Sequence, residues 1–518
     1  MLPAVNQRTA GSPSHGVVAA GHPLSAEAGA DALRAGGNAV DAALAAMLAS
    51  FAAEPLLSGL GAGGYMLVVP GGERLWTGPR ESTTGKPVVL DFFVEVPGRD
   101  ADQAQRAELV PVDVSFGDAV QLFNVGAASV GTYGMVHGIC TASERFGRLP
   151  LPELAAPASA LARAGVPLNA QQAYVVEILG GIVTLTPEVA AIYAPQGRVL
   201  REGELLHQPD LAGAIERLAT EGARPFYEGD VADAVVALLA EQGGLLTAAD
   251  LAAYETVLRE PVRARYRGRE VLTNPPPSAG GTLIAYALAL LDRDSPPPTP
   301  PSLEALVAVM EATQRERGPD FLDGLDEPGF AERFFASRLG STTHIAVIDG
   351  SGGACSVTCS NGEGAGIVVP GTGIHLNNML GEHDLNPLGF HMFPPGRRLP
   401  SMMAPTAVLR DGTPELVLGS AGSNRIRSAI LQTIVAALDH GMRAGDAVRA
   451  PRIHFEDGVI YAEPGVDVDA LEAEGHAIAR FRALNLFFGG VQAVERDPAT
   501  GALSGGGDPR RGGAAVVA

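Results

Sequence analysis

The sequence predicts an α+β protein in which helices cover the outer faces of two stacked sheets. Three observations lead to this fold class. Nearly all-apolar helical segments lie toward both ends of the chain, at 39–53 and 426–440. Residues 130–260 carry the 3.6-residue period of helices, whereas strand patterns between turn residues dominate from residue 342 onward. Each sheet must bury its apolar faces, so layers of helix, sheet, sheet and helix are expected.

The first elements along the chain alternate between strand and helix. Val17–Ala20 is a short apolar strand, and an amphipathic helix follows over 24–35. Asn38 is placed to cap a second helix over 39–53, which is apolar on nearly every side and is therefore predicted to be buried. A glycine loop then leads into a strand over 65–69.

That loop, Gly59-Leu60-Gly61-Ala62-Gly63-Gly64, satisfies the pattern G-x-G-x-x-G. A dinucleotide site needs a strand before this pattern and a helix after it, so that the pyrophosphate meets a helix N-terminus. Here the order is reversed. The loop therefore indicates a tight turn with close backbone packing rather than a nucleotide site.

The middle of the chain is mainly helical and is followed by a breaker-rich segment. The expected elements are helices at Pro152–Ala164, Pro209–Thr220, Val231–Gln242 and Thr282–Leu291, and a strand at Ala264–Leu272. Residues 318–340 are rich in Gly, Asp and Pro with few periodic apolar positions. A flexible, exposed segment is expected there, where a chain can be cut without unfolding its core.

Beyond residue 342 the chain predicts a hairpin, more strands and one long helix. The hairpin strands lead up to Asp349 and run over Ala354–Cys359. The further strands expected are Gly366–Val369, Met403–Leu409, Glu415–Gly419, Val459–Ala462 and Gly490–Glu495, with a helix at Ile426–His440.

Composition narrows the possible function classes. The chain has 518 residues, 46% hydrophobic and 18% charged, with a net charge of −21, which argues against binding nucleic acid or an anionic membrane surface. No apolar stretch reaches transmembrane length, and the N-terminus lacks the apolar core of a signal peptide. We therefore expect a cytoplasmic protein. The three cysteines form no disulfide framework, the histidines show no metal-ligand spacing, and no cofactor or metal is expected.

Thr342 is the most informative residue because it stands in front of a strand pattern, after the breaker-rich segment. Its hydroxyl can reach the carbonyl carbon before it, and cleavage there makes Thr342 a new N-terminus. One residue then holds a nucleophile and a free amine that can serve as its base. His344 lies close by, and either a direct role or a packing role for it is open.

Several stretches together resemble the γ-glutamyltransferase (glutathione hydrolase) family of N-terminal-nucleophile hydrolases. They occur in family order, which makes the resemblance far more specific than one motif. The matching stretches are Gly21-His22-Pro23-Leu24-Ser25-Ala26-Glu27-Ala28-Gly29, Gly36-Gly37-Asn38-Ala39-Val40-Asp41-Ala42-Ala43, Gly59–Gly64, Pro275–Gly281, Thr342-Thr343-His344, Pro370–Ile374 with Leu376-Asn377-Asn378, and Asp508-Pro509-Arg510-Arg511.

The resemblance implies an αββα sandwich made as a precursor and cleaved between Ser341 and Thr342. Residues 1–341 then form a helix-rich large segment that contributes strands to the sandwich, and residues 342–518 form a small segment that begins with the nucleophile. The two products are expected to stay together as a heterodimer.

The resemblance also implies roles for individual residues around the nucleophile Thr342. Ser360 takes the place of a threonine whose hydroxyl supports the nucleophile, and Thr358 and Asn361 fall near the residues that surround it.

Two further stretches correspond to substrate contacts and to the oxyanion site. Ser401 and Met402 occupy the family's Ser-Ser position, which holds a substrate carboxylate. Gly422 and Ser423 lie in the loop that matches Gly-Ser-Pro-Gly-Gly. Their backbone amides are the expected oxyanion donors, since such donors are fixed in place before the charge forms.

The chain departs from the family where the γ-glutamyl group is recognised. Phe93 stands where the family has an arginine for the α-carboxylate, and an aromatic ring cannot pair with that group. Glu382 follows Asn-Asn, where the family acid binds the α-amino group. Two alternatives remain open. An arginine from a differently routed loop, Arg80 or Arg99, could take the place of the family's arginine, or Glu363 and Glu382 could give the substrate site a different polarity.

Three functions follow. The first is a γ-glutamyltransferase-like amide hydrolase or acyltransferase, and the second is an acylase of the same superfamily for other acyl groups. The third is a non-catalytic binding relative, which Phe93 favours but the joint presence of Thr342, Ser360 and Asn361 disfavours. The expected partners are a small-molecule amide (a γ-glutamyl compound or another acylated amine) and water or an amine acceptor, with no nucleic acid and no membrane.

Overall fold

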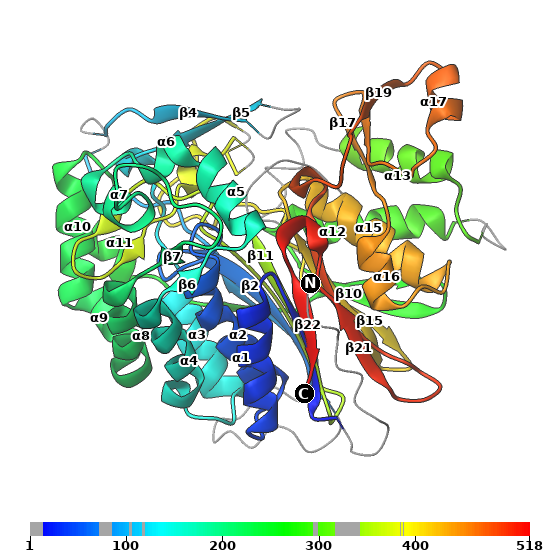
Figure 1. Cartoon of the computed structure of the whole chain (residues 1–518), viewed down its shortest axis with the longest axis horizontal. Helices are drawn as coiled ribbons and strands as arrows, with labels where there is room; N and C mark the ends of the chain where they lie inside the picture. Colours follow the sequence, from blue (N-terminus) through cyan, green and yellow to red (C-terminus); the bar gives the residue numbers. More distant parts are fainter. Residues whose placement is uncertain are drawn as a thin grey trace.

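The computed structural model describes residues 14–71, 85–102, 106–115, 120–293, 299–315, 342–383, 385–386 and 388–518. Within these residues two antiparallel sheets lie face to face, and helices cover the outer side of each (Figure 1). This is the layering of helix, sheet, sheet and helix that the sequence predicts, and the α+β fold class is confirmed.

The larger sheet combines strands from both ends and the middle of the chain. Its seven strands are, in spatial order, β22 (Ala514–Val517), β1 (Gly16–Ala20), β11 (Thr343–Asp349), β12 (Ala354–Ser360), β2 (Gly63–Val69), β3 (Val88–Phe92) and β8 (Val257–Arg259). All neighbours in this sheet pair antiparallel.

The smaller sheet is built mostly from the C-terminal part of the chain. Its six antiparallel strands are, in order, β21 (Leu503–Gly506), β20 (Gly490–Arg496), β16 (Thr413–Ala421), β15 (Thr406–Arg410), β10 (Arg269–Thr273) and β9 (Val262–Tyr266).

Helices fall into two groups, one for each outer face. The larger sheet is covered by α1 (Pro23–Arg34), α2 (Ala39–Ala53), α3 (Met135–Phe146), α4 (Leu151–Ala164), α8 (Pro209–Glu221), α9 (Arg224–Glu228), α10 (Asp230–Glu241) and α11 (Ala248–Ala252). The smaller sheet is covered by α12 (Ala279–Leu291), α13 (Leu303–Arg315), α15 (Arg425–Leu438) and α16 (Ala444–Arg449). Figure 1 shows the two groups on opposite sides of the strands.

Smaller elements surround this sandwich. They are α5 (Ala170–Ile178), α6 (Gly180–Val183), α7 (Pro187–Tyr193) and α17 (Asp469–Ala473), with the strand groups β4 (Val110–Ser115) and β5 (Val120–Val125), β6 (Val166–Pro167) and β7 (Leu205–Leu206), β13 (Val368–Val369) and β14 (Ile374–His375), and β17 (Ile453–Glu456), β18 (Val459–Ala462) and β19 (Ala477–Arg480). None of the helices in the described ranges is long and apolar enough to cross a lipid bilayer.

Helix α2 shows how local sequence sets the fold behind Thr342. The Asn38 side chain accepts hydrogen bonds from the amides of Val40 (2.9 Å) and Asp41 (3.0 Å), and Asp41 accepts one from the Asn38 amide (2.9 Å). This capping box satisfies amides that would otherwise lack partners. Every residue of the helix is buried, as its apolar composition predicts, and the helix packs behind β11 and β12.

One predicted strand is wrong. Residues 264–272 form parts of the hairpin strands β9 and β10, joined at Arg267 and Gly268, which both have positive φ angles (50° and 74°). Two successive positive φ angles define the tight turn that suits the twist of a hairpin. The predicted flexible segment 318–340 lies outside the described residues.

Candidate active site

Thr342 lies directly before β11, at the end of the larger sheet where β12 finishes. The register pairs Thr343 with Cys359, so Thr342 is next to Ser360. Successive side chains of a strand point to opposite faces. Thr342 therefore faces the space between the two sheets together with His344, whereas the Thr343 side chain faces α2.

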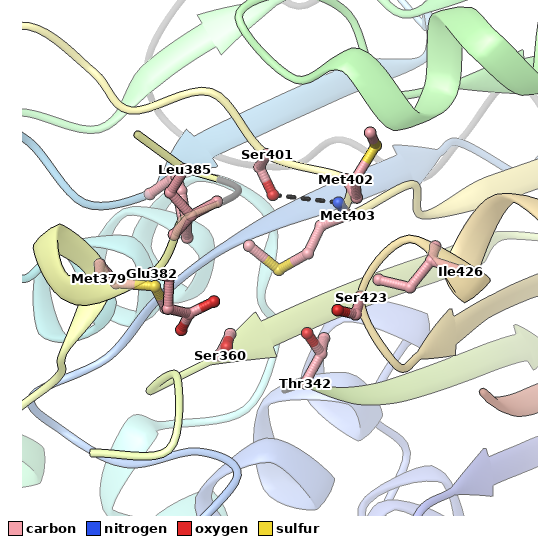
Figure 2. A pocket seen from close by; sticks show the side chains of 11 residues that line it. Thr342, Ser360, Met379, Glu382, Leu385, Ser401, Met402, Met403, Ser423 and Ile426 are labelled. Carbon is pink, nitrogen blue, oxygen red and sulfur yellow. Dashed lines mark hydrogen bonds between the residues drawn. The ribbon is translucent and has the colours of Figure 1, made fainter. Parts of the chain in front are cut away.

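A cavity with about 250 Å³ of empty space opens beside Thr342 (Figure 2). Segments that are far apart in the sequence contribute its wall. Six lining residues are apolar, four carry hydroxyl groups, and only one of these described residues is charged. They are Phe93, Met379, Leu385, Met402, Met403 and Ile426, then Thr342, Ser360, Ser401 and Ser423, and finally Glu382.

The structure brings most of the predicted site residues to this cavity. Thr342, Ser360, Ser423, Phe93, Glu382, Ser401 and Met402 all line it. Thr358 does not, because its hydroxyl bonds to His344 Nδ1 at 2.8 Å inside the sandwich. Asn361 also points elsewhere, and its side-chain amide donates to the His375 carbonyl oxygen at 3.3 Å. Ser341 lies outside the described residues.

Ser360 is held at the cavity wall by the turn that follows it. Its Oγ accepts a hydrogen bond from the Gly362 amide at 3.0 Å. Gly362 has a φ of 61°, and a Cβ there would come within 2.3 Å of the Glu382 carboxylate. A glycine at this position therefore lets the turn carrying Ser360 approach Glu382 closely.

The expected oxyanion turn joins β16 to the N-terminus of α15. Gly422 and Ser423 have positive φ angles of 106° and 69°. The carbonyl oxygens of both residues accept hydrogen bonds from the first turn of α15, from Arg425 at 3.1 Å and Ile426 at 3.0 Å. Backbone amides at a helix N-terminus favour a developing negative charge. In Figure 2 the side chain of Ser423 points toward that of Thr342.

Ser401 and Met402 lie on a segment that the Pro-rich loop before α12 fixes. The Ser401 carbonyl oxygen accepts hydrogen bonds from Ser278 Oγ (2.9 Å) and the Ala279 amide (2.7 Å). Ser401 Oγ accepts one from the Met403 amide at 3.0 Å, which is the dashed line in Figure 2. This local anchoring holds Met402 and Met403 against the cavity.

Phe93 forms an aromatic wall of the cavity. Its ring stacks on that of Tyr65, with centroids 5.4 Å apart. The backbone is fixed as well, because the Phe93 carbonyl oxygen accepts hydrogen bonds from Tyr254 (2.6 Å) and Arg398 (2.5 Å). The amide donates to Asp91 Oδ1 at 3.1 Å. A rigid, buried ring therefore forms the wall at the position where the resemblance implies an arginine.

No arginine of the described residues takes over from Phe93 at the cavity wall. Arg99 pairs with Glu95 (3.3 Å) and Asp250 (3.4 Å). Arg398 lies over the Tyr254 ring at 4.7 Å. Arg80 lies outside the described residues, and Glu363 is buried but does not line the cavity.

His344 lies inside the sandwich and serves packing and hydrogen bonding. Burial lowers its pKa to about 3, so the ring is neutral at physiological pH. Its ring lies against Gly419 of β16, where a Cβ would come within 2.3 Å of it. The ring therefore packs β11 against the opposite sheet and forms a hydrogen bond with the Thr358 hydroxyl.

Two features of the site were not expected from the sequence. Met379, Leu385, Met403 and Ile426 complete the apolar wall, yet each reads as an ordinary core residue in the sequence. Glu54 at the end of α2 accepts a hydrogen bond from the Thr343 hydroxyl at 3.1 Å.

Within the described ranges, no group of three or more His, Cys, Asp or Glu residues is placed to hold a metal ion.

Comparison with known proteins adds to this geometry. The sequence matches the family model of gamma-glutamyltranspeptidase over residues 25–323 and 326–518. It is 33% identical to the acylase ACY 1 proenzyme of Pseudomonas sp. (strain SE83), over 95% of this chain and 92% of that protein. It is 31% identical to the glutathione hydrolase proenzyme of Escherichia coli (strain K12), over 96% and 90%. The solved structure of cephalosporin acylase from Bacillus halodurans has a TM-score of 0.80 and 27% identity, covering 100% of this chain and 98% of that one.

Proposed function

Because the chain belongs to the gamma-glutamyltranspeptidase family, we propose that Thr342 is the nucleophile of an amide hydrolase for acyl groups without a free carboxylate. The family confirms the resemblance found in the sequence and makes the protein an amide hydrolase and acyltransferase of the N-terminal-nucleophile type. The position of the cut, the roles of the residues and the acyl group are the proposal.

The first step of the proposal is self-cleavage between Ser341 and Thr342. The Thr342 hydroxyl attacks the Ser341 carbonyl carbon, the peptide C–N bond breaks, and water hydrolyses the resulting ester. Ser341 then ends in a carboxylate and Thr342 begins with a free amine. The products, 1–341 and 342–518, stay together because β11 and β12 of the second product are interior strands of the larger sheet, paired with β1 and β2 of the first.

Turnover uses the new amine as the base. It takes the hydroxyl proton as Thr342 Oγ attacks the substrate carbonyl carbon. The amides of Gly422 and Ser423 donate to the oxyanion that forms, and Ser360 supports the hydroxyl at the wall it shares with Thr342. Collapse expels the amine product, which takes the proton. Water or a second amine then releases the acyl group from its ester with Thr342.

The composition of the cavity wall carries the proposal about the acyl group. Phe93 replaces the guanidinium that would pair with a carboxylate, and no described lining residue is basic. Among the described lining residues, Glu382 is the only acidic one. At an effective dielectric constant of 20, two carboxylates about 6 Å apart repel by roughly 3 kcal/mol. The cavity therefore favours uncharged or amine-bearing acyl groups over anionic ones.

The similar proteins support an acylase. The acylase ACY 1 proenzyme and cephalosporin acylase both match nearly the full chain. Hydrolysis of γ-glutamyl compounds is the second candidate, because glutathione hydrolases match with nearly the same identity. Glu382, the acid after Asn-Asn, lines the cavity where an α-amino group would need a partner.

Matched anilides test this proposal. Pentanoyl and glutaryl p-nitroanilide share a five-carbon acyl chain, and only the second ends in a carboxylate; γ-glutamyl p-nitroanilide adds the α-amino group. We expect kcat/KM to be at least about tenfold higher for the pentanoyl than for the glutaryl compound. The glutaryl carboxylate would be buried without the charged hydrogen bond that an arginine supplies, and such a bond contributes roughly 1.5–3 kcal/mol. The Thr342→Ala variant should hydrolyse none of them. Faster turnover of the glutaryl or γ-glutamyl compound would contradict the proposed specificity.

A further inference from the structure

Ser423 has an unusual backbone conformation for its position. Six described residues other than glycine have positive φ angles: Asp100, Arg267, His391, Asp411, Ser423 and Asp457. Arg267, Asp411 and Asp457 are each followed by a glycine in a hairpin turn, where such angles are ordinary. Ser423 is the only buried residue of the six, and it lines the cavity beside Thr342.

A side chain at this backbone conformation is strained, and a glycine would relieve the strain. Strained residues persist where the surrounding structure fixes them, and they gather at active sites. Here the surroundings do fix the turn. The Asn424 side chain donates to the Glu456 carboxylate, and Arg425 Nε donates to the Phe487 carbonyl oxygen at 2.9 Å. Gly422 packs against the Gly489 backbone.

The Ser423 hydroxyl is therefore placed by the same turn as the expected oxyanion donors. It belongs to the residue whose own amide is one of those donors, so covalent geometry keeps its Oγ close to that amide. The side chain lines the cavity and points toward Thr342 in Figure 2. A hydroxyl here can donate to an oxygen that the amide also contacts.

We propose that the Ser423 hydroxyl is a catalytic residue that donates a third hydrogen bond to the tetrahedral oxyanion. As Thr342 Oγ bonds to the substrate carbon, the carbonyl π electrons move to oxygen, and the two amides and the hydroxyl stabilise that charge. The electrons return when the leaving amine departs, and no proton passes from Ser423. The inference rests on acyl transfer at Thr342 and is independent of which acyl group the cavity prefers.

Two substitutions separate the hydroxyl from the backbone strain. Ser423→Ala removes only the hydroxyl, whereas Ser423→Gly removes the hydroxyl and relieves the strain. Loss of one oxyanion donor lowers kcat by roughly 100- to 1000-fold. We expect both variants to lose at least about tenfold in kcat with KM within about twofold of the wild type. The midpoint of thermal unfolding should be higher for Ser423→Gly than for Ser423→Ala.

The kinetics use whichever anilide the wild type hydrolyses best, with rates normalised to the cleaved fraction measured by intact mass. A stabilised Ser423→Gly variant that turns over slowly supports the inference, because a purely structural role predicts the opposite. Wild-type kcat in Ser423→Gly, or in Ser423→Ala, would overturn it. Preference of the wild type for glutaryl anilide would contradict the proposed specificity and leave this comparison intact.

Discussion

The hydroxyl of Thr343 donates a hydrogen bond to Glu54 at 3.1 Å, on the face of β11 opposite to the side chain of Thr342. This contact joins the end of α2 to the residue after Thr342. Glu54 is fully buried, and burial raises its pKa from 4.5 to about 7, although the hydrogen bond from Thr343 and the charge of Arg511 act in the other direction. A carboxyl group whose pKa is near neutral pH therefore lies directly behind β11, the strand that follows Thr342.

This carboxyl group predicts a pH-dependent stability. The pKa of Glu54 is higher in the folded state than in the unfolded chain, so protonated Glu54 favours folding. This contribution to the free energy of unfolding is fully present below pH 4.5 and is lost as the pH rises through about 7. The difference in pKa corresponds to about 3 kcal/mol. The uncleaved Thr342→Ala protein is the background for denaturant unfolding between pH 4 and 8. Glu54→Gln should remove this part of the pH dependence and be the more stable protein at pH 8. If the free energy of unfolding changes with pH in the same way with and without Glu54→Gln, Glu54 does not titrate in this range.

The close packing of Gly422 predicts a large catalytic effect. A Cβ at this position would lie 2.6 Å from the Gly489 Cα, and its φ of 106° is unfavourable for any other residue. Gly422→Ala should displace the expected oxyanion amide and lower kcat by on the order of 10²–10³. The matched control is Gly412→Ala, which also has a positive φ (80°) but no atom within 4 Å of the new Cβ. Gly412→Ala should lose about 1–2 kcal/mol of stability, because its Cβ disfavours a positive φ, and keep its turnover. If both variants fold and are equally active, the turn at Gly422 is not part of the site.

The aromatic wall predicts a change of specificity. Phe93→Arg should bring a cation to the cavity and raise the kcat/KM ratio of glutaryl to pentanoyl p-nitroanilide by at least about tenfold. The backbone at this position should hold, since Tyr254 and Arg398 fix its carbonyl oxygen. Phe93→Leu is the control without charge, and it should lower both rates without changing their ratio. An unchanged ratio in Phe93→Arg would mean that the acyl chain does not reach this wall.

Local sequence patterns predict well those helices and strands whose ends carry capping or turn residues. The helix expected over 39–53 has those bounds in the structure, because Asn38 caps it and its apolar residues leave it no exposed face. The prediction of a single strand over 264–272 is wrong because the residues on both sides of the Arg267-Gly268 turn favour strands, so the turn does not interrupt the sequence pattern. The hairpin of β4 and β5 was missed as well, since its burial depends on distant parts of the chain.

The same distinction applies to the cavity. Polar residues such as Ser360, Glu382 and Ser401 could be predicted from motifs whose order along the chain resembles a family. Met379 and Ile426 could not, because an apolar residue in a cavity wall has the same sequence signal as one in the core. The raised pKa of Glu54 depends on burial between α2 and the larger sheet, which no local pattern encodes.

The central claim is that Thr342 becomes the N-terminal nucleophile, and intact mass spectrometry of the purified protein tests it most directly. Wild-type protein should resolve into chains of 341 and 177 residues that remain associated, the smaller one beginning Thr-Thr-His. The Thr342→Ala variant should stay a single chain. A wild-type preparation that remains at 518 residues through long incubation, while still hydrolysing anilides, would contradict both the processing and the mechanism that depends on it.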